Sequence, residues 1–542
     1  MAVPKTFLLS SPLSRSPTPT VYIIGGGVAG LLTAQALLID PLDGASGDRH
    51  PDLQVVIVER AEQLGMGLTQ GNGRSLTATE GLVAAGIPPA ALEQALVTPL
   101  QKGGYAYPGF VPNGADRAEM DQYAAGLRAI APEINNRDLS LVRFGLANLK
   151  LWRRWAERYP ALATASGFYL NEKLRIYGGS RAQERAIAEV NRLNQAGIDC
   201  DWPHQPGRLA THADALAFDP AMGPYFSCPS TSQQALTLQP GGAVHGGRLV
   251  EQLANKLLAT GQVAVCTQTQ VREILWRSPN PTSPQQRSIT GLQVERAGQL
   301  EPLGTADDCY VFATGFDEVL YQSGAIAAPL FPVAGTSITL PLPKNSGSNT
   351  PQFPQRAWKQ DVLGPLVFSP TFDPTLDQWI LRIGGFKFYP GGAAHPPLDL
   401  GHPGVKWAVQ QQIQQAIAFL PDAMGQILGN DTLVALVAPN TSKPLKNTDV
   451  MDVMDWDCLC DRVNPWVGVR PLYADGMAAL GPFARNGYAI SGTGSWGLSS
   501  GIGNAALIQQ WLRGRSTSDL TLPGIPTPWL QDYLQRTDPL RF

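Results

Sequence analysis

Three glycines at the end of a short apolar run carry the first chemical signal in this chain. Residues 21–24 are Val-Tyr-Ile-Ile, and Gly25, Gly27 and Gly30 follow at the spacing G-x-G-x-x-G before the apolar stretch 31–39. This order predicts the strand, tight turn and helix start of a dinucleotide-binding unit. Gly25 permits the sharp turn, Gly27 lets the backbone approach a pyrophosphate, and Gly30 lets helix and strand pack closely. The N–H groups at the helix start would bind the phosphates, aided by the helix dipole.

An acidic residue ends the next predicted strand. Residues 54–60 read Gln-Val-Val-Ile-Val-Glu-Arg, and Glu59 stands where a nucleotide site places the acid that binds the adenosine ribose. Glu59 lies 29 residues after Gly30, where about 20 is usual, and the polar loop at 40–53 explains the excess. A mere strand-end charge is the alternative interpretation.

Two further glycine-rich stretches suggest backbone that lies close to a cofactor. The loop 65–75 follows Glu59 and contains Thr69, Asn72 and Gly73, although its composition also suits a plain surface loop. Near the end of the chain, a short strand at 488–491 leads into the glycine-rich turn 492–503 and then a helix through Trp511. This second turn repeats the arrangement of N–H donors at a helix start.

Composition excludes several classes of protein. The chain has 542 residues, a formal net charge of −3 and 16% charged residues, against a usual level of about 25%. This charge balance provides no basic surface for nucleic acid. The longest apolar runs are far shorter than the roughly 18 residues that cross a bilayer, which leaves only peripheral membrane contact open. The length suits a large core and two or more domains.

Cysteine spacing and the first residues bear on metal binding and location. Only Cys458 and Cys460 are close in sequence among six cysteines, and no nearby histidines complete a zinc site, so we expect no metal. The apolar patch within residues 1–19 is shorter than the roughly 7–15 residues of a secretory signal, which predicts a disordered leader. We therefore expect a cytoplasmic protein with reduced cysteines.

Hydrophobic periodicity gives the remaining elements and an α/β fold. Residues 139–159 have helical period, with a Trp-rich apolar face that favours packing. Segments 167–170 and 174–177 suggest a pair of strands, and 341–353 suggests an exposed loop. The other predicted helices are 181–195, 248–259 and 404–420, and the other predicted strands are 263–266, 270–275, 309–315 and 378–388.

The order of these features resembles the FAD-dependent D-amino-acid oxidase/dehydrogenase superfamily, which includes glycine and sarcosine oxidases. The chain looks most similar to bacterial D-amino-acid dehydrogenases, through residues 331–340 and the segment around Arg470. It departs from them at Thr493, where they generally have histidine, and at Arg74 and Ser75. The residues that carry the resemblance are 25–30 with Glu59, 71–73, 242–245, 269–271, 312–315, 331–335, 381–385, 468–471, 475–476, 492–494 and Gly497.

The resemblance implies FAD as cofactor and oxidation of an amine. Hydride would pass from the α-carbon of an amino acid to flavin N5, giving an imine that water hydrolyses, and no protein general base is required. Arg470 matches the arginine of the family's Gly-x-Arg-Pro segment and would bind the substrate carboxylate, with a structural arginine as the alternative. Oxygen, a quinone or another carrier would reoxidise the flavin.

The resemblance also implies which residues hold the cofactor and substrate. Residues 494–500 would lie against the flavin, and Val271 would bind the adenine through its backbone. Tyr177 and Trp496 are pocket candidates with Arg470, although aromatic residues more often pack in cores; His245 and Thr493 would support the site. The implied FAD-binding residues are Gly25, Gly27, Val28, Ala29, Gly30, Glu59, Arg60, Thr69, Asn72, Gly73, Val271, Ala313, Thr314, Gly315, Gly492, Gly494, Ser495, Trp496, Gly497, Leu498 and Ser499.

We expect a Rossmann-like FAD-binding domain interleaved with an antiparallel-sheet substrate domain. The FAD domain would comprise residues 20–104, 239–328 and 467–542, and the substrate domain 105–238 and 329–466. Two other functions stay open: an FAD monooxygenase or halogenase, and an accessory flavoprotein without amino-acid oxidation. The pattern G-x-G-x-x-G recurs after a predicted strand only at 492–497, the turn assigned to the flavin, which disfavours a separate site for a bound pyridine nucleotide.

Overall fold

The structure is a computed structural model of the chain. It describes residues 20–39, 53–71, 73–80, 106–107, 109–198, 202, 205–222, 234–277, 286–342, 353–360, 366–373, 376–392, 398–429 and 455–542. The predicted leader, Asn72 and most of the predicted loop 341–353 lie outside these residues. Within the described part, no helix combines the length and apolar character needed to span a bilayer.

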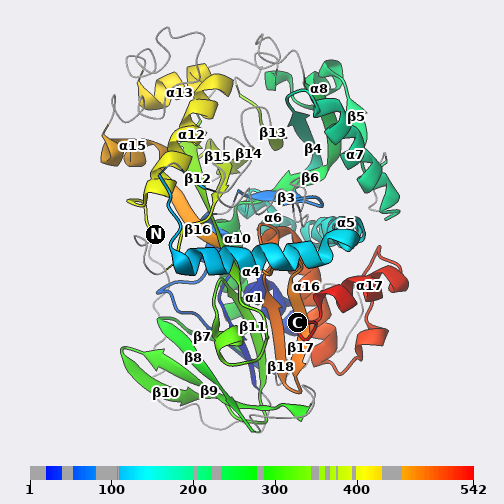
Figure 1. Cartoon of the computed structure of the whole chain (residues 1–542), viewed down its shortest axis with the longest axis vertical. Coiled ribbons are helices and arrows are strands. Elements are labelled where there is room, and N and C mark those ends of the chain that lie inside the picture. Colours follow the sequence, from blue (N-terminus) through cyan, green and yellow to red (C-terminus); the bar gives the residue numbers. More distant parts are fainter. Residues whose placement is uncertain are drawn as a thin grey trace.

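A six-stranded sheet forms the lower half of the molecule in Figure 1. Its order is β17-β18-β11-β1-β2-β7, and all neighbours pair in parallel except β17 with β18. The central strands are continuous apolar runs, as expected for a parallel sheet covered on both faces. The strands are β1 (Thr20–Ile24), β2 (Gln54–Val58), β7 (Val263–Cys266), β11 (Cys309–Gly315), β17 (Ala479–Ala484) and β18 (Gly487–Ser491).

Helices cover one face of this sheet and a small sheet covers the other. Helix α1 (Val28–Leu38) packs beside α16 (Gly497–Leu512), and both are almost entirely buried. The other face contacts an antiparallel sheet of order β10-β9-β8 through a core that includes Tyr22 and Val294. Those strands are β8 (Thr269–Trp276), β9 (Ile289–Arg296) and β10 (Gln299–Leu303).

A second large sheet, mostly antiparallel, forms the upper half of the molecule (Figure 1). Its order is β16-β12-β15-β14-β13-β4-β6-β3, and β5 (Arg208–Ala210) pairs with β6 as its ninth strand. Its strands come from distant parts of the chain, so the two halves of the molecule are interleaved. They are β3 (Ser75–Thr77), β4 (Tyr169–Tyr177), β6 (Ala235–Ala243), β12 (Phe331–Pro341), β13 (Trp358–Gln360), β14 (Leu366–Asp373), β15 (Gln378–Phe388) and β16 (Trp466–Leu472).

Alternation along these strands gives the upper sheet two different faces. The outer face is apolar and packs against α12 (Pro403–Phe419) through residues such as Ile338 and Ile383. The inner face lies against the glycine-rich segment 65–75, since Ser337 Oγ donates a hydrogen bond to the Gly71 carbonyl. This inner face consists of small and polar residues, among them Gly335, Ser337, Thr339, Ser369, Thr371, Arg382 and Gly384.

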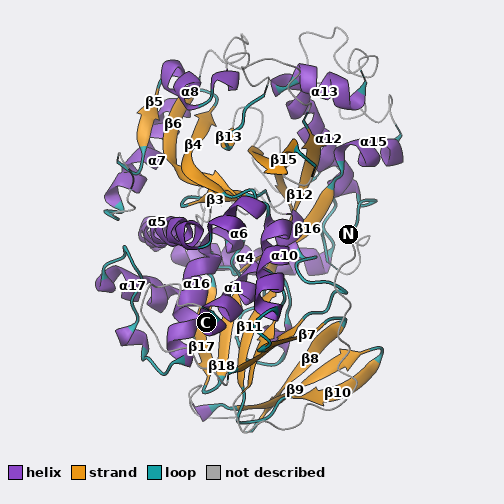
Figure 2. Ribbon diagram, turned by 180° about the vertical axis from the view of Figure 1, so that it is seen from behind, coloured by secondary structure: helices purple, strands orange, loops and turns teal. Residues whose placement is uncertain are grey.

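Helices fill the space between the two sheets, as seen from both sides in Figures 1 and 2. The central ones are α4 (Gly114–Ile130), α5 (Ile134–Arg158), α6 (Pro160–Ala165) and α10 (Gly246–Leu258). The remaining helices are α2 (Leu68–Gly71), α7 (Ala182–Gln195), α8 (His212–Phe218), α11 (Val319–Gln322), α13 (Pro421–Leu428), α15 (Trp456–Val463) and α17 (Thr527–Thr537).

The predicted α/β class is confirmed, and one local prediction is wrong. The proposed strand pair at 167–170 and 174–177 is a single strand, β4, which pairs along its whole length with β6. The polar residues between its apolar ends suggested a turn. Lys173 is instead fully buried, with its ammonium bonded to Glu80, and the strand runs straight through.

Candidate active site

The first glycine turn is shaped by close backbone contacts. Gly25 has a φ of +112°, and a Cβ there would lie 2.2 Å from the Ala313 carbonyl oxygen. A Cβ at Gly30 would lie 2.1 Å from the Gly25 carbonyl oxygen. Side chains are therefore excluded at both positions, because the end of β11 and the start of α1 press against the turn. This matches the roles expected for Gly25 and Gly30.

The start of α1 has the features of an anion site. Gly27 is its N-cap without a side-chain hydrogen bond, and its first turn contains no acidic residue. The Val28 N–H donates to Thr69 Oγ1 at 3.2 Å, which brings the loop after β2 to the helix start. Nearby, Thr314 Oγ1 is buried without a hydrogen-bond partner among the described residues. A helix start that lacks a capping carboxylate, beside an unsatisfied hydroxyl, fits a bound pyrophosphate.

The carboxylate of Glu59 lies directly beside this turn. Its Oε2 accepts a hydrogen bond from the Gly26 N–H at 2.8 Å, and its Oε1 accepts one from the Ala61 N–H at 2.9 Å. The Thr269 N–H donates to the Glu59 carbonyl, so β8 with Val271 begins next to the acid. The arrangement of Glu59 at the end of β2 supports its predicted role at the ribose.

Arg60 follows Glu59 and pairs with an acidic residue beyond the end of β11. Its side chain is 56% exposed and forms an ion pair with Asp317 at 3.4 Å.

The second glycine turn is held against β16. Gly492 and Gly494 have φ values of +68° and +57°, and the Gly494 N–H donates to the Pro471 carbonyl at 2.9 Å. A Cβ on Gly492 would lie 2.3 Å from the ring of Tyr473. The turn ends at Gly497, where α16 begins without an acidic residue in its first turn. Its start thus repeats the anion-binding features of α1.

Two residues of this turn also contact β3. Trp496 Nε1 donates to the Thr77 carbonyl at 2.8 Å, and Ser499 Oγ accepts from the Thr77 N–H at 3.1 Å. These bonds fix the start of α16 to the edge of the upper sheet. The Ser499 hydroxyl is therefore used in a structural contact, and Leu498 is buried in the core around α1 and α16.

A cavity lies between the second turn and the inner face of the upper sheet. It brings together Arg470 and Trp496, two of the three residues predicted for substrate binding. Thr493 and Ser495 also line it, together with Glu80 and Lys387, and aromatic and apolar walls complete it. Those walls are Tyr123, Leu141, Val333, Leu472 and Tyr533.

Arg470 lies flat over a glycine of the neighbouring strand. It is opposite Val333 in the pairing of β16 with β12, and a Cβ on Gly335 would lie 1.6 Å from Arg470 Nη1. Glycine at position 335 therefore leaves the space that the guanidinium occupies. This contact gives a physical reason for glycine at position 335, which is one of the residues that carry the family resemblance.

Two charged residues of the cavity were missed from the sequence. Glu80 forms a buried ion pair with Lys173, at 2.5 Å between Oε1 and Nζ. Burial opposes ionisation of Glu80, but Lys173, with Lys359 and Lys387, lowers the pKa of its carboxyl to about 2. Lys387 lies between Phe386 and Phe388 in the apolar strand β15, and this lone lysine was the signal available in the sequence. Glu80, Tyr123 and Tyr533 lie in segments without such a signal.

His245 serves as a helix cap outside this cavity. Its Nδ1 accepts a hydrogen bond from the Arg248 N–H at the start of α10, and its Nε2 lies 2.8 Å from Arg74 Nη2. Burial, followed by the charges of Arg74, Arg248 and Arg382, lowers the pKa of His245 to about 2. The ring is therefore neutral at physiological pH and positions α10 and Arg74.

Tyr177, the third predicted substrate residue, does not line this cavity. It ends β4 opposite Ala235 and packs in a small cluster with Ala182 and Ala186 of α7. Lys173, beside the cavity, lies four residues earlier, and an extended strand covers about 13 Å over that distance. The structure thus gives Tyr177 a packing role at the far end of the sheet.

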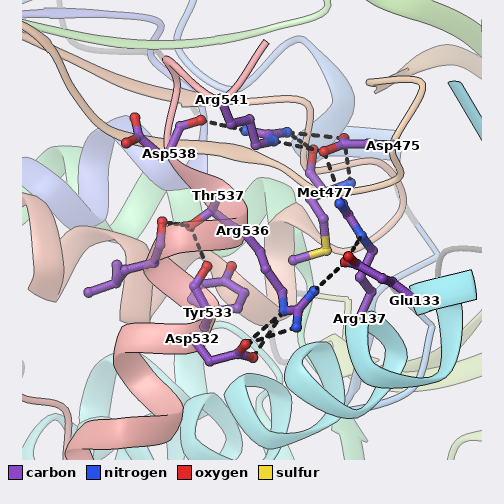
Figure 3. A network of polar contacts seen from close by, with 11 residues as sticks. Glu133, Arg137, Asp475, Met477, Asp532, Tyr533, Arg536, Thr537, Asp538 and Arg541 are labelled. Atoms are coloured by element: carbon purple, nitrogen blue, oxygen red, sulfur yellow. Dashed lines mark hydrogen bonds and ion pairs between the residues drawn. The ribbon is translucent and has the colours of Figure 1, made fainter. Parts of the chain in front are cut away.

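A network at the end of the chain holds the segment after Arg470 (Figure 3). Arg541 contacts Asp475 through Nε and Nη2, at 2.7 and 3.1 Å, and Arg137 Nη1 contacts the same carboxylate at 3.1 Å. Arg541 also donates to the Met477 carbonyl at 2.8 Å. Asp475 precedes Gly476, which lines the cavity. The C-terminal segment and α5 therefore fix one wall of the site.

A metal centre has no support in the described residues, which contain no cluster of three or more His, Cys, Asp or Glu side chains suited to a metal ion.

Comparison with solved structures identifies the fold. Glycine oxidase from Geobacillus kaustophilus has a TM-score of 0.54 at 15% identity, with 97% of this chain and 100% of that chain covered. A variant of L-amino acid deaminase from Proteus vulgaris that lacks an insertion has a TM-score of 0.53 at 13% identity, with 100% and 99% covered. Iminodiacetate oxidase from Chelativorans sp. BNC1 has a TM-score of 0.52 at 14% identity, with 96% and 99% covered.

Sequence comparison identifies the family. No curated protein matches the chain, but the family model DAO, described as FAD dependent oxidoreductase, matches residues 20–440. This match covers most of the chain and confirms the resemblance and FAD, the cofactor that the resemblance implies. The chain belongs to the DAO family of FAD-dependent oxidoreductases.

Proposed function

We propose that this protein oxidises the Cα–N bond of an amino acid or a related amine. The observation that carries the proposal is Arg470, which lies over Gly335 in a cavity bordered by the second glycine turn. A guanidinium positioned in this way can bind a carboxylate through two parallel hydrogen bonds. The names of the solved relatives support amino acids and amines as the substrate class.

The chain itself would position the reactants. Gly25, Gly27, Glu59 and Thr314 would hold FAD at the first turn, and residues 492–499 would lie against its ring. When bound, FAD supplies the acceptor for the hydride of the substrate. Arg470 would fix the substrate by its carboxylate, while Val333, Leu472 and Trp496 would exclude water from the reacting carbon. The N–H groups at the start of α16 would stabilise negative charge that develops near them.

The finer assignments are part of the proposal. A D-amino acid is one candidate substrate, from the similarity to D-amino-acid dehydrogenases, and an L-amino acid or N-substituted glycine is another. Oxygen or a quinone-type carrier would then reoxidise the flavin. The domain boundaries inferred from the sequence and the individual FAD contacts remain predictions.

One anaerobic experiment tests the proposed function. The holoenzyme is mixed with D-amino acids, L-amino acids, N-methyl amino acids, NADH and NADPH in turn, and loss of the visible absorbance of oxidised flavin is measured. We expect an amino acid or N-methyl amino acid to bleach the flavin. Bleaching by NADH or NADPH alone would instead indicate a monooxygenase or halogenase type of enzyme. Bleaching by none of these would indicate an accessory flavoprotein.

A further inference from the structure

The cavity contains a cation that the binding of a simple amino acid does not use. Lys387 lies on the inner face of the upper sheet, between two phenylalanines whose rings belong to the outer core. The backbone of β15 is irregular here, with a φ of +49° at Phe386, and the lysine side chain lines the cavity with Arg470. A lysine in this position is directed at the same space as the proposed carboxylate anchor.

The charges around Lys387 are unbalanced. Its charged neighbours are Arg470, Lys359 and Glu80. Glu80 is already paired with Lys173 at 2.5 Å. Within the described part of the chain, Lys387 forms no hydrogen bond or ion pair of its own. Among the described residues that line the cavity, Lys387 is thus a cation without a counter-charge of its own, since Glu80, the carboxylate beside it, is already neutralised by Lys173.

Such an arrangement costs stability unless a ligand offsets it. Burial of an ammonium without a partner is unfavourable, and like charges beside it add to this cost. The result is visible in the pKa of Lys387, which burial, followed by Arg470 and Lys359, lowers to about 7. Groups that reduce stability in this way are common where a site is built for binding. A ligand whose single carboxylate binds Arg470 would leave Lys387 without a counter-charge.

We propose that the preferred substrate is a dicarboxylic amino or imino acid, whose α-carboxylate binds Arg470 and whose second carboxylate binds Lys387. This inference rests on the proposed function, because it assigns the reacting carbon to the molecule held between these two cations. It specifies the substrate class by its two negative charges. The configuration at the α-carbon is determined with the panel of D- and L-amino acids described above.

Binding of dicarboxylates that cannot be oxidised tests this inference without turnover. The holoenzyme is titrated with succinate and glutarate, and with butyrate and valerate as monocarboxylates of matched length, and the change in the visible spectrum of oxidised FAD gives each Kd. We expect the dicarboxylates to bind about 10- to 100-fold more tightly, the range for one charge-assisted contact. Lys387→Met should remove this preference, and Lys387→Arg should retain it.

Matched controls separate the possible outcomes. Lys256→Met changes a lysine that packs on Tyr159 of another region and should leave the preference unchanged. Equal affinity for both ligand classes in the unaltered enzyme would overturn the inference, and this comparison needs no variant. A preference for dicarboxylates that persists in Lys387→Met would also overturn the inference. So would an equal loss of affinity for dicarboxylates and monocarboxylates in that variant.

The two proposals can fail separately. If neutral amino acids reduce the flavin while dicarboxylates show no preference, only the assignment of Lys387 fails. If no amino acid reduces the flavin, the proposed function fails whatever the binding data show.

Discussion

At the scale of single residues, the site depends on which side chains are small enough to leave room for others. Gly335 provides the space for the guanidinium of Arg470, and Gly492 provides the space for the ring of Tyr473. Gly335 thereby differs from Gly25, whose positive φ and backbone contacts exclude any side chain, whereas Gly492 combines a φ of +68° with the space that it leaves for Tyr473. Two kinds of glycine therefore occur in this chain, one that shapes the backbone and one that makes room for a functional side chain.

Gly335→Ala should impair the substrate site through Arg470. The new methyl group would occupy the position of Nη1 and displace the guanidinium, whose flexible side chain can move aside. We expect KM for the amino acid to rise about tenfold or more, while the FAD content stays at the level of the unaltered protein. Steady-state kinetics and flavin absorbance measure both quantities. An unchanged KM would show that the position of Arg470 over this glycine is unimportant.

Lys387→Met should stabilise the protein in a way that depends on pH. The pKa of Lys387 is lowered to about 7 by burial and by Arg470 and Lys359, with Glu80 opposing, whereas the unfolded chain has the ordinary lysine value. The free-energy cost of holding the Lys387 ammonium in the folded protein is thus fully present below pH 7. It disappears as pH rises toward about 10.4, where the lysine of the unfolded chain also loses its proton. We expect the variant to gain about 1–3 kcal/mol at pH 6 and little near pH 10.

Thermal or denaturant unfolding at the two pH values checks this expectation for Lys387. A loss of stability at pH 6 would mean that the ammonium has a stabilising partner, contrary to the unbalanced cavity described above.

At the scale of elements, two helix starts and two glycine turns would form the proposed cofactor site. Both α1 and α16 begin without an acidic residue in the first turn, and both lie against the six-stranded sheet. The first turn follows β1 and the second follows β18, which both pair with β11. The carboxyl ends of these parallel strands therefore meet at one edge of the sheet, where ligands of open α/β sheets bind.

Gly27→Ala should separate folding from cofactor binding. Gly27 has an ordinary φ of −80°, and a Cβ there would meet only Thr69 Oγ1 at 3.2 Å, so the protein itself tolerates the methyl group. The pyrophosphate would not, and we expect the Kd for FAD to rise at least about tenfold. Gly25→Ala should instead destabilise the fold by about 1–3 kcal/mol or more, because its Cβ meets backbone.

Fluorescence titration of the apoproteins with FAD and denaturant unfolding compare these two glycine variants. Full FAD affinity in Gly27→Ala would place the pyrophosphate elsewhere.

Arg541→Ala should loosen the wall of the cavity that follows β16. Arg541 makes two contacts with the Asp475 carboxylate, which only Arg137 Nη1 and the Met477 N–H would then hold among the described residues. We expect a loss of about 1–3 kcal/mol in the free energy of unfolding and a rise in KM that is larger than the change in kcat. Arg181→Ala, which removes an exposed ion pair with Glu184, is the control and should change neither quantity.

A drop in kcat with KM unchanged would contradict a positioning role for Arg541 and the network in Figure 3.

At the scale of the whole molecule, local signals in the sequence identified FAD as the cofactor but not most of the residues that line the cavity beside Arg470. Each FAD signal, such as the turn at Gly25 or the strand ending at Glu59, lies within one short segment where apolar runs meet glycine or an acid. The proposed substrate cavity instead combines Glu80, Lys387 and Tyr533, each more than a hundred residues from the next. No local pattern relates such positions, because the interleaved chain alone brings them together.

The misplacement of Tyr177 has the same physical origin. The resemblance made this aromatic residue a pocket candidate, yet only the length of β4 decides which end of the strand reaches the site. That length was underestimated because the Lys173–Glu80 ion pair lets a polar stretch remain in a buried strand. Ion pairs between residues that are distant in the sequence do not change the hydrophobic periodicity of either segment.

The central claim is that Arg470 anchors an amino acid for oxidation at the second glycine turn. Its most direct test is the anaerobic reductive half-reaction of Arg470→Ala beside the unaltered enzyme, with substrate concentration varied to saturation. We predict that the variant retains FAD and that its apparent Kd for the amino acid rises about 10- to 150-fold, the range for lost charge-assisted hydrogen bonds. An unchanged Kd with unchanged FAD content would contradict the claim.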